Sequence, residues 1–170
     1  MNNWPDQLFD VLKRSDVRQV GYVPDAGHSR LIERCRGDSN IHAVSLTTEE
    51  EGVALAAGAW LGGERAALLM QSSGVGNCIN MLSLSRTCRF PMPMFITMRG
   101  EWEEFNPWQV PMGQATEPVL KLCDAEIMRV RKPEDVAGVA ERALQSAYGD
   151  ERIVAVLLSQ ELIGKKVWTK

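Results

Sequence analysis

Three consecutive carboxylates, Glu49, Glu50 and Glu51, open a stretch that is otherwise built of small apolar residues as far as Gly63. A carboxyl group can give a proton to a ring nitrogen or share one with it, which is the work of a general acid or base. Thr48 precedes the acids and predicts a helix N-cap, and acids in a first helical turn suit the positive end of the helix dipole. The three acids therefore serve either catalysis or helix stability.

A glycine loop with the sequence QSSGVGN occupies Gln71–Asn77, where a predicted strand turns into a predicted helix. The backbone N–H groups of such a turn can bind an anion. The loop is not GxGxxG and no P-loop lysine follows it, so a tight strand-to-helix turn explains it at least as well as a nucleotide site. Ser72 and Ser73 do not occupy a GxSxG elbow, which argues against a hydrolase.

Three further polar residues follow predicted strands. Asp25 and His28 come after the first strand, and Arg99 comes after the fourth. His28 is either a proton donor or a solvated loop histidine. Arg99 is either a surface arginine or a ligand for an anionic substrate group, for which its guanidinium fork is well shaped.

The segments that carry these residues alternate between short apolar runs and helical patterns. Strands are predicted at 17–23, 41–45, 66–70, 94–98, 126–130 and 153–158. Helices are predicted at 5–14, 27–36, from 49, at 76–88 and at 133–147. Six strands joined mainly by helices predict an α/β fold, a three-layer sandwich with a six-stranded parallel sheet and helices on both faces.

Ligands bind beyond the carboxyl ends of the strands in such sheets. We expect Pro24–His28, Gln71–Asn77 and Arg99–Trp108 to meet at that edge. The longest irregular stretch is expected at Arg99–Gln114 and contains Trp102, Phe105 and Trp108. A loop of this length usually has a binding role or is partly disordered.

Composition narrows the class of protein. A length of 170 residues fits one domain, 1–170, and the net charge of −3 with scattered Lys and Arg argues against nucleic acid as a partner. No apolar run approaches the roughly 20 residues that cross a bilayer, and the N-terminus lacks the order of a signal peptide. The cysteines are widely spaced and form no CxxC pair, which predicts reduced, mostly buried thiols in a cytoplasmic protein and no structural zinc.

The order of the motifs resembles the pyrimidine-binding domain of thiamine-diphosphate-dependent decarboxylases. Glu49–Gly63 follows the family phrase EEEGxxLxAGAxLxG, and Met70–Asn80 follows MQxSGxGNxxN. The similarity extends over about 17–123. It is strongest to the alpha subunits of sulfopyruvate decarboxylases, with phosphonopyruvate decarboxylases as near relatives.

The resemblance implies a role for one glutamate, which hydrogen-bonds N1′ of the aminopyrimidine of thiamine diphosphate and so promotes loss of the thiazolium C2 proton. The family spacing to Gly58 selects Glu49, with Glu50 as the alternative. The implied cofactor contacts are Glu49, Pro24, Gln71, Ser73, Gly74, Val75, Gly76 and Asn77. The candidate substrate contacts are Asp25, His28 and Arg99.

The family's metal and diphosphate motif, GDG followed by an asparagine, is not found, and Gly37–Asn40 is only a superficial echo of it. No metal ligand is therefore assigned to this chain. The resemblance implies a separate beta chain that carries the diphosphate and Mg²⁺. We expect a hetero-oligomer that is inactive without this partner, although the isolated chain could form a homo-oligomer.

The implied function is that of a carboxy-lyase subunit, in coenzyme M biosynthesis or sulfonate metabolism, that converts 3-sulfopyruvate into sulfoacetaldehyde and CO₂. Phosphonopyruvate is the alternative substrate, because both compounds are 2-oxo acids with a tetrahedral anionic head. A non-catalytic pyrimidine-binding module with a regulatory or structural role is a third interpretation.

Overall fold

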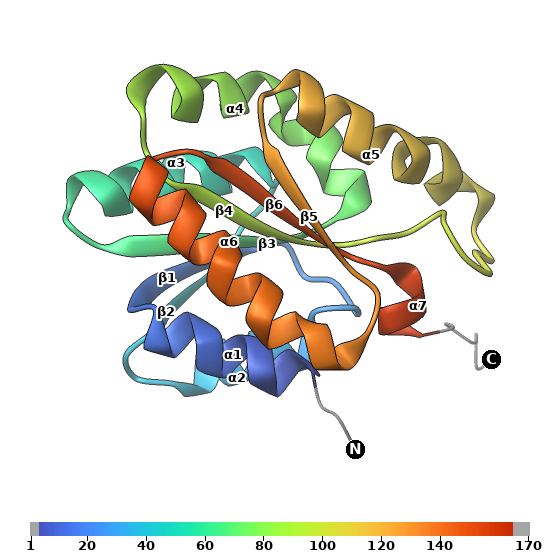
Figure 1. Ribbon diagram of the computed structural model, residues 1–170, viewed down its shortest axis with the longest axis horizontal. Coiled ribbons are helices and arrows are strands. Elements are labelled where there is room, and N and C mark those ends of the chain that lie inside the picture. Colours follow the sequence, from blue (N-terminus) through green and yellow to red (C-terminus); the bar gives the residue numbers. More distant parts are fainter. Residues whose placement is uncertain (1–3, 165–170) are drawn as a thin grey trace.

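The computed structural model describes residues 4–164 and shows one sheet of six parallel strands in the order β2-β1-β3-β4-β6-β5 (Figure 1). The strands are β1 (Val17–Tyr22), β2 (His42–Ser45), β3 (Arg65–Gln71), β4 (Met92–Thr97), β5 (Glu126–Val130) and β6 (Ile153–Leu158). The helices are α1 (Trp4–Arg14), α2 (Ser29–Gly37), α3 (Glu50–Leu61), α4 (Val75–Cys88), α5 (Val110–Leu122), α6 (Val136–Asp150) and α7 (Gln160–Ile163). Short 3₁₀ turns are η1 (Ser72–Gly74), η2 (Pro107–Gln109) and η3 (Pro133–Asp135).

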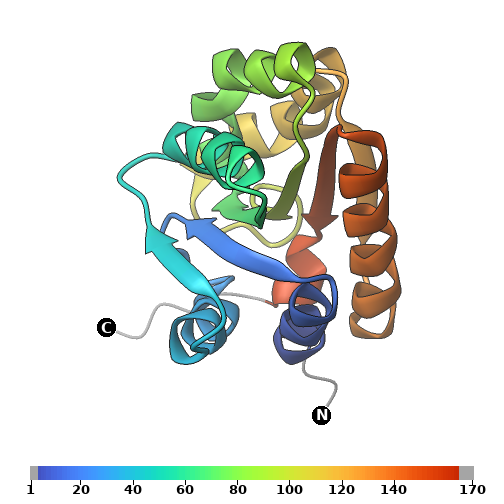
Figure 2. The same cartoon turned by 90° about the vertical axis from the view of Figure 1, so that its left-hand side faces the viewer.

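Helices cover both faces of the sheet, which confirms the predicted three-layer α/β sandwich. Helices α1, α2 and α6 pack on one face, and α3, α4 and α5 pack on the other (Figures 1 and 2). The strand side chains alternate between the two cores: Phe95 of β4 joins the first, whereas Met94 and Ile96 join the second. Burial on both faces explains why the central strands are continuous apolar runs.

The fourth strand begins earlier than the predicted Met94–Met98, because β4 includes Pro93. A proline has no N–H to donate and is unusual in an interior strand. Here β3 pairs with β4 only from Met94 onward, so no ladder bond on that side requires an N–H from Pro93.

The prediction of an irregular stretch as far as Gln114 was wrong, because α5 starts at Val110 and continues to Leu122. Two prolines obscure this helix in the sequence. Pro111 lies in the first turn, where a missing N–H costs nothing. Pro118 lies inside the helix, and Gln114, whose carbonyl loses its helical partner there, is exposed to water. Helix α7 was not predicted at all.

The start of α3 also differs from the prediction, because the N-cap position is Glu49 rather than Thr48, and no side chain caps it. The turn is held instead by Glu51, whose carboxylate accepts the N–H of Thr47 at 2.7 Å. Just inside the helix, a Cβ at Gly52 would overlap the side chain of Leu68. Glycine at this position therefore allows α3 to approach β3 closely.

The chain reverses its direction of winding between β1 and β3, since β2 lies on one side of β1 and β3 on the other. The carboxyl ends of adjacent strands flank a crevice at such a switch point, where α/β proteins bind ligands. The loops after β1, β3 and β4 all lie at this edge, toward the right of Figure 1. Among the described residues, no helix is long and apolar enough to span a membrane.

Candidate active site

Four side chains join the three loops at the carboxyl edge. Oδ1 of Asp25, after β1, accepts the amide of Gln71 at 2.9 Å, and its Oδ2 accepts the hydroxyl of Thr97 at 2.7 Å. Gln71 in turn accepts the hydroxyl of Ser73 at 2.8 Å. The predicted meeting of the loops after β1 and β3 is confirmed by these bonds. Asp25 thus ties the glycine loop to the ends of β1 and β4.

Glu49 is the buried member of the three acids, at 7% exposure, whereas Glu50 and Glu51 are exposed. Its Oε2 accepts a hydrogen bond from the amide of Asn77 at 2.7 Å. A Cβ at Gly74 would overlap the Glu49 carboxyl group, so only glycine lets this side chain lie against η1. The acid at the start of α3 and the glycine loop therefore form one cradle.

The cysteine nearest this cradle is inert. Burial, and then the carboxylates of Glu49 and Glu50, raise the pKa of the Cys78 thiol to about 12. A thiol with so high a pKa stays protonated and is a poor nucleophile. All four cysteines are free, but the prediction of mostly buried thiols holds only for Cys35 and Cys78, since Cys88 is exposed and Cys123 half-buried.

His28 is fully buried, so its interpretation as a solvated loop histidine was wrong. Its Nε2 lies 3.0 Å from the carbonyl oxygen of Phe95, and its ring meets Trp4 edge-on. Its Nδ1 has no hydrogen-bond partner among the described residues. Burial lowers the pKa of His28, and the negative charge of Asp25 opposes this shift only in part. A neutral His28 therefore connects the loop after β1 to the backbone of β4.

Arg99 is buried at 6% exposure, so its interpretation as a surface arginine was also wrong. Its guanidinium group makes a two-pronged ion pair with Glu104, with Nε 2.7 Å from Oε2. The guanidinium fork is therefore already occupied by a carboxylate of the same chain.

The remaining predicted cofactor contacts are Pro24, Val75 and Gly76, of which only Val75 and Gly76 adjoin the cradle. Pro24 is exposed and, with Asp25, lines an open groove of about 740 Å³ between α2 and β2. Val75 is buried and Gly76 exposed in the first turn of α4, and a Cβ at Gly76 would lie 3.5 Å from the sulfur of Met112. The first turn of α5 is thus a neighbour of the glycine loop.

Sequence reasoning missed Thr97, Glu104 and Gln160. Thr97 is the last residue of a buried strand and Gln160 is the second residue after another, and this position is the signal that could have found them. Glu104 gives no such signal, because it lies in an acidic loop among other carboxylates.

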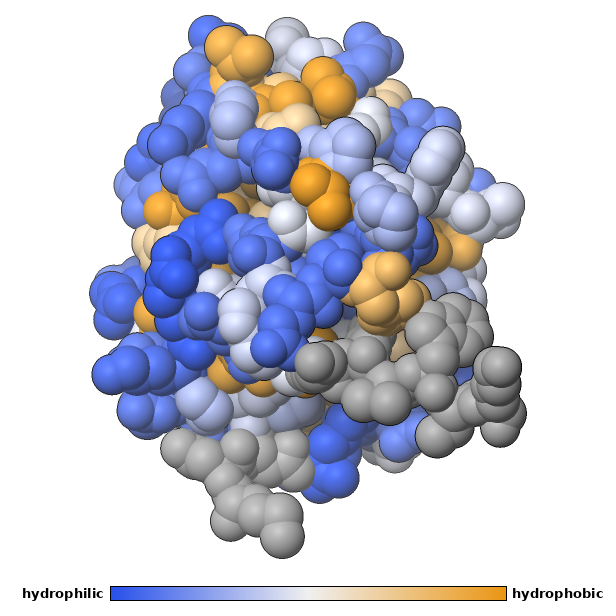
Figure 3. Space-filling model, turned by 90° about the vertical axis from the view of Figure 1, so that its right-hand side faces the viewer, coloured by the Kyte–Doolittle hydropathy of each residue, from blue (hydrophilic) through white to orange (hydrophobic). Residues whose placement is uncertain are grey.

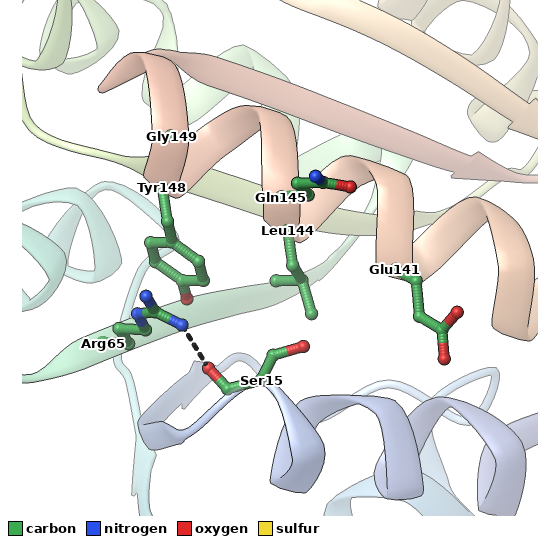
Figure 4. Close-up of a pocket in the computed structure, with 7 residues that line it drawn as sticks. All are labelled: Ser15, Arg65, Glu141, Leu144, Gln145, Tyr148 and Gly149. Carbon is green, nitrogen blue, oxygen red and sulfur yellow. Dashed lines mark hydrogen bonds between the residues drawn. The ribbon is translucent and has the colours of Figure 1, made fainter.

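A second hollow, of about 330 Å³, lies at the opposite, amino end of the sheet between α1, β3 and α6 (Figure 4). Two of its polar side chains are engaged: Arg65 donates to the carbonyl of Ser15 at 2.8 Å and stacks on Tyr148, whose hydroxyl donates to the carbonyl of Ala66. No group of His, Cys, Asp or Glu side chains in the described part of the chain has the arrangement of a metal site.

Comparison with known proteins gives consistent results. Residues 3–117 match the family model described as thiamine pyrophosphate enzyme, N-terminal TPP binding domain. The chain is 34% identical to the sulfopyruvate decarboxylase subunit alpha of Methanocaldococcus jannaschii, over 88% of this chain and 89% of that protein. It is 39% identical to the phosphonopyruvate decarboxylase of Streptomyces viridochromogenes, over 65% of this chain but 28% of that protein.

Among solved structures, the 2-oxoglutarate:ferredoxin oxidoreductase of Magnetococcus marinus is similar in fold, with a TM-score of 0.73 over 94% of this chain and 29% of that chain. The sequence identity of 12% makes this a likeness of fold alone.

Proposed function

The chain belongs to the sulfopyruvate decarboxylase alpha-subunit family of thiamine pyrophosphate enzymes, and from this premise we propose that it supplies the pyrimidine-binding half of an enzyme that decarboxylates 3-sulfopyruvate to sulfoacetaldehyde. The observation that carries the proposal is the buried carboxyl group of Glu49 against Gly74. Glycine at position 74 lets this carboxyl group lie against the glycine loop, and a carboxyl group can share a proton with the N1′ nitrogen of an aminopyrimidine.

Each residue of the cradle has a task in this proposal. Glu49 holds or gives a proton at the ring nitrogen N1′, and Asn77 fixes the orientation of the carboxyl group through its 2.7 Å hydrogen bond. Gln71 and Ser73 fix the backbone of the glycine loop, against which the ring would lie. Thiamine diphosphate, when bound, supplies the centre that accepts the electrons left by departing CO₂.

A partner chain completes the site in this proposal and holds the diphosphate and Mg²⁺, in the cytoplasm. The outer face of α3 supports it. Ala54 and Gly58 are exposed there, Leu61 is 89% exposed, and no neighbouring group in the described part of the chain lies within 4 Å of a Cβ at Gly58. An apolar helix face of small residues suits close packing against another protein.

Substrate contacts divide between direct and indirect roles. We retain Asp25 as the neighbour of the reacting group, since it is half-exposed at the groove and part of the loop network. We assign His28 and Arg99 to positioning, because both are buried and bound to other groups of the chain.

Phosphonopyruvate stays as the second candidate substrate, because the chain is also similar to a phosphonopyruvate decarboxylase. A purely structural module is less well supported, since the acid and the glycine that accommodates it are both present.

The test is a decarboxylation assay of the chain mixed with a partner that carries the GDG motif, thiamine diphosphate and Mg²⁺. We expect CO₂ release from 3-sulfopyruvate by the pair and by neither chain alone. Faster release from phosphonopyruvate would reassign the substrate. A stable pair that binds the cofactor but decarboxylates neither acid would refute the enzymatic proposal.

A further inference from the structure

The loop between β4 and η2 has an internal anchor. Residues 98–106 form neither helix nor strand, and irregular segments of this length are commonly mobile. Here a single carboxylate accepts hydrogen bonds from several residues of the loop. Glu104 accepts hydrogen bonds from five donor atoms: Nε and Nη2 of Arg99, the backbone N–H groups of Gly100 and Asn106, and the amide of Gln160.

The anchor is buried, although the loop lies at the surface. The side chains of Arg99 and Glu104 are 7% and 4% exposed, and the Phe105 ring lies 5.3 Å from the guanidinium group. The hydrogen bonds from Arg99 lower the pKa of Glu104 to about 2, so the carboxylate stays charged at neutral pH. Removing one partner of a buried ion pair leaves an uncompensated charge, which strongly disfavours any other loop conformation.

Gln160 connects the loop to the end of β6. Its amide nitrogen donates to Glu104 at 2.8 Å, while its Oε1 accepts the N–H groups of Glu101 and Trp102 at 2.9 and 3.0 Å. The loop is thus fixed at both of its halves by groups that are distant in the sequence.

The base of the loop touches the cradle of the candidate active site. The N–H of Arg99 donates to the hydroxyl of Ser72 in η1 at 3.1 Å. A Cβ at Gly113 would overlap the carbonyl of Arg99, and Gly100 has φ +73 with its open side against Gln109. The loop base is clamped between η1 and α5, two residues from Gly74 and its contact with Glu49.

We infer that Glu104 is a positioning residue that holds the segment 99–109 as a rigid wall beside the glycine loop. The 2-oxo acid of the proposed reaction binds against this wall. The catalytic consequence rests on the proposed function, whereas the ordering of the loop does not. Trp102, Phe105 and Trp108 stand out from this wall at 37%, 42% and 82% exposure. Figure 3 looks onto this edge of the molecule.

The first experiment measures backbone hydrogen–deuterium exchange in the full, isolated chain. Glu104→Gln presents an amide N–H₂ to groups that are themselves donors, so we expect exchange across 100–106 to accelerate by about tenfold or more, with α4 unchanged. Glu103→Gln removes a charge from the adjacent exposed residue and is the matched control. Gln160→Met keeps the Arg99–Glu104 pair, should give a smaller acceleration, and serves if Glu104→Gln does not fold.

The second experiment uses the assembled pair with thiamine diphosphate. Glu104→Gln should lower kcat/KM for 3-sulfopyruvate about tenfold or more, mainly through KM, because the wall is no longer preformed. Exchange of the cofactor C2 proton should stay within about twofold, since Glu49 lies on another element.

Loop exchange unchanged in both Glu104→Gln and Gln160→Met would overturn the inference. So would a parallel fall in C2 exchange and decarboxylation, which would indicate a general structural defect. If the unmodified pair does not decarboxylate, the proposed function fails, and the exchange measurement still decides whether Glu104 orders the loop.

Discussion

The two helix layers of this protein differ in how their outer surfaces are built. Helices α1, α2 and α6, the charged layer, are joined on the outside by ion pairs such as Arg30–Asp6 and Arg14–Glu141, both at 2.6 Å. Helices α3, α4 and α5, the apolar layer, expose Leu61, Ile79, Leu84 and Leu122. Every exposed large hydrophobic side chain among the described residues lies on this layer or on the loop that leads to it.

The difference shows how one sheet serves two purposes. Exposed ion pairs contribute little to stability but keep the charged layer soluble. Exposed apolar side chains have no such use, and under the proposed function they are where the partner chain would pack. We therefore propose that the charged layer serves the stability of this chain, while the apolar layer, with Glu49 at the start of α3, serves assembly and catalysis. Changes in the first should affect stability, and changes in the second should affect function.

The largest effect is expected for Glu49, the acid at the start of the apolar layer. Glu49→Gln keeps an acceptor for Asn77 and should leave the melting temperature of the chain unchanged. In the assembled enzyme it should slow exchange of the cofactor C2 proton by about 10²–10⁴-fold, because acid–base catalysis at N1′ is lost. NMR of the C2 proton measures this rate directly.

Glu50→Gln changes the adjacent exposed acid and is the control, with an expected change within about twofold. If Glu50→Gln slowed the exchange and Glu49→Gln did not, the catalytic acid would be Glu50, and burial would have been the wrong criterion.

Much of this molecule could be predicted from its sequence, for reasons that differ from element to element. The apolar runs of β3 and β6 are buried on both faces, so local composition is sufficient to place them. Helix α5 was missed because Pro118 lies inside it, where it is tolerated because the carbonyl left without a helical partner belongs to the exposed Gln114. Local patterns cannot show such compensation.

The candidate site also contains residues that could be predicted from the sequence and residues that could not. Glu49 and the glycine loop could be found because their spacing along the chain resembles a family pattern. The bond between Gln160 and Glu104 joins residues 56 positions apart, and no spacing rule links them. The guanidinium group of Arg99 is occupied by Glu104, which lies only five residues further along in an irregular acidic loop. No helical or strand pattern predicts how such a loop folds back, which is why this group was open to interpretation as a substrate ligand.

A smaller effect is expected in the charged layer, where His28 should make the free energy of unfolding depend on pH. Burial lowers the pKa of His28 below its ordinary 6.5, so just below pH 6.5 the unfolded chain binds a proton at this residue and the folded chain does not. The free energy of unfolding should therefore decrease as pH falls below about 6.5, by at most about 1.4 kcal/mol per pH unit for one proton. Urea unfolding of the isolated chain between pH 7 and 5 measures the slope.

His28→Gln should remove this slope, and His42→Gln, at the exposed histidine, should retain it. Glu104 does not interfere, because its pKa of about 2 means that its contribution is lost only as pH falls from about 4.5 toward 2. An equal slope in the unmodified chain and in His28→Gln would mean that other groups govern the acid sensitivity.

The smallest effects are expected from replacing one glycine in each layer by alanine. At Gly58 in α3 and at Gly149 in α6, an added Cβ would meet no neighbouring group among residues 4–164 within 4 Å. Alanine should stabilise the isolated chain at either site by up to about 1 kcal/mol, because glycine is a poor helix former. Only at Gly58 should the added methyl group weaken binding to the partner chain, since only that helix face is proposed to pack against it. Urea unfolding and titration of the two variants with the partner separate these effects. Equal partner affinities for Gly58→Ala and Gly149→Ala would show that α3 does not lie in the interface, and the functional distinction between the layers would then rest on Glu49 alone.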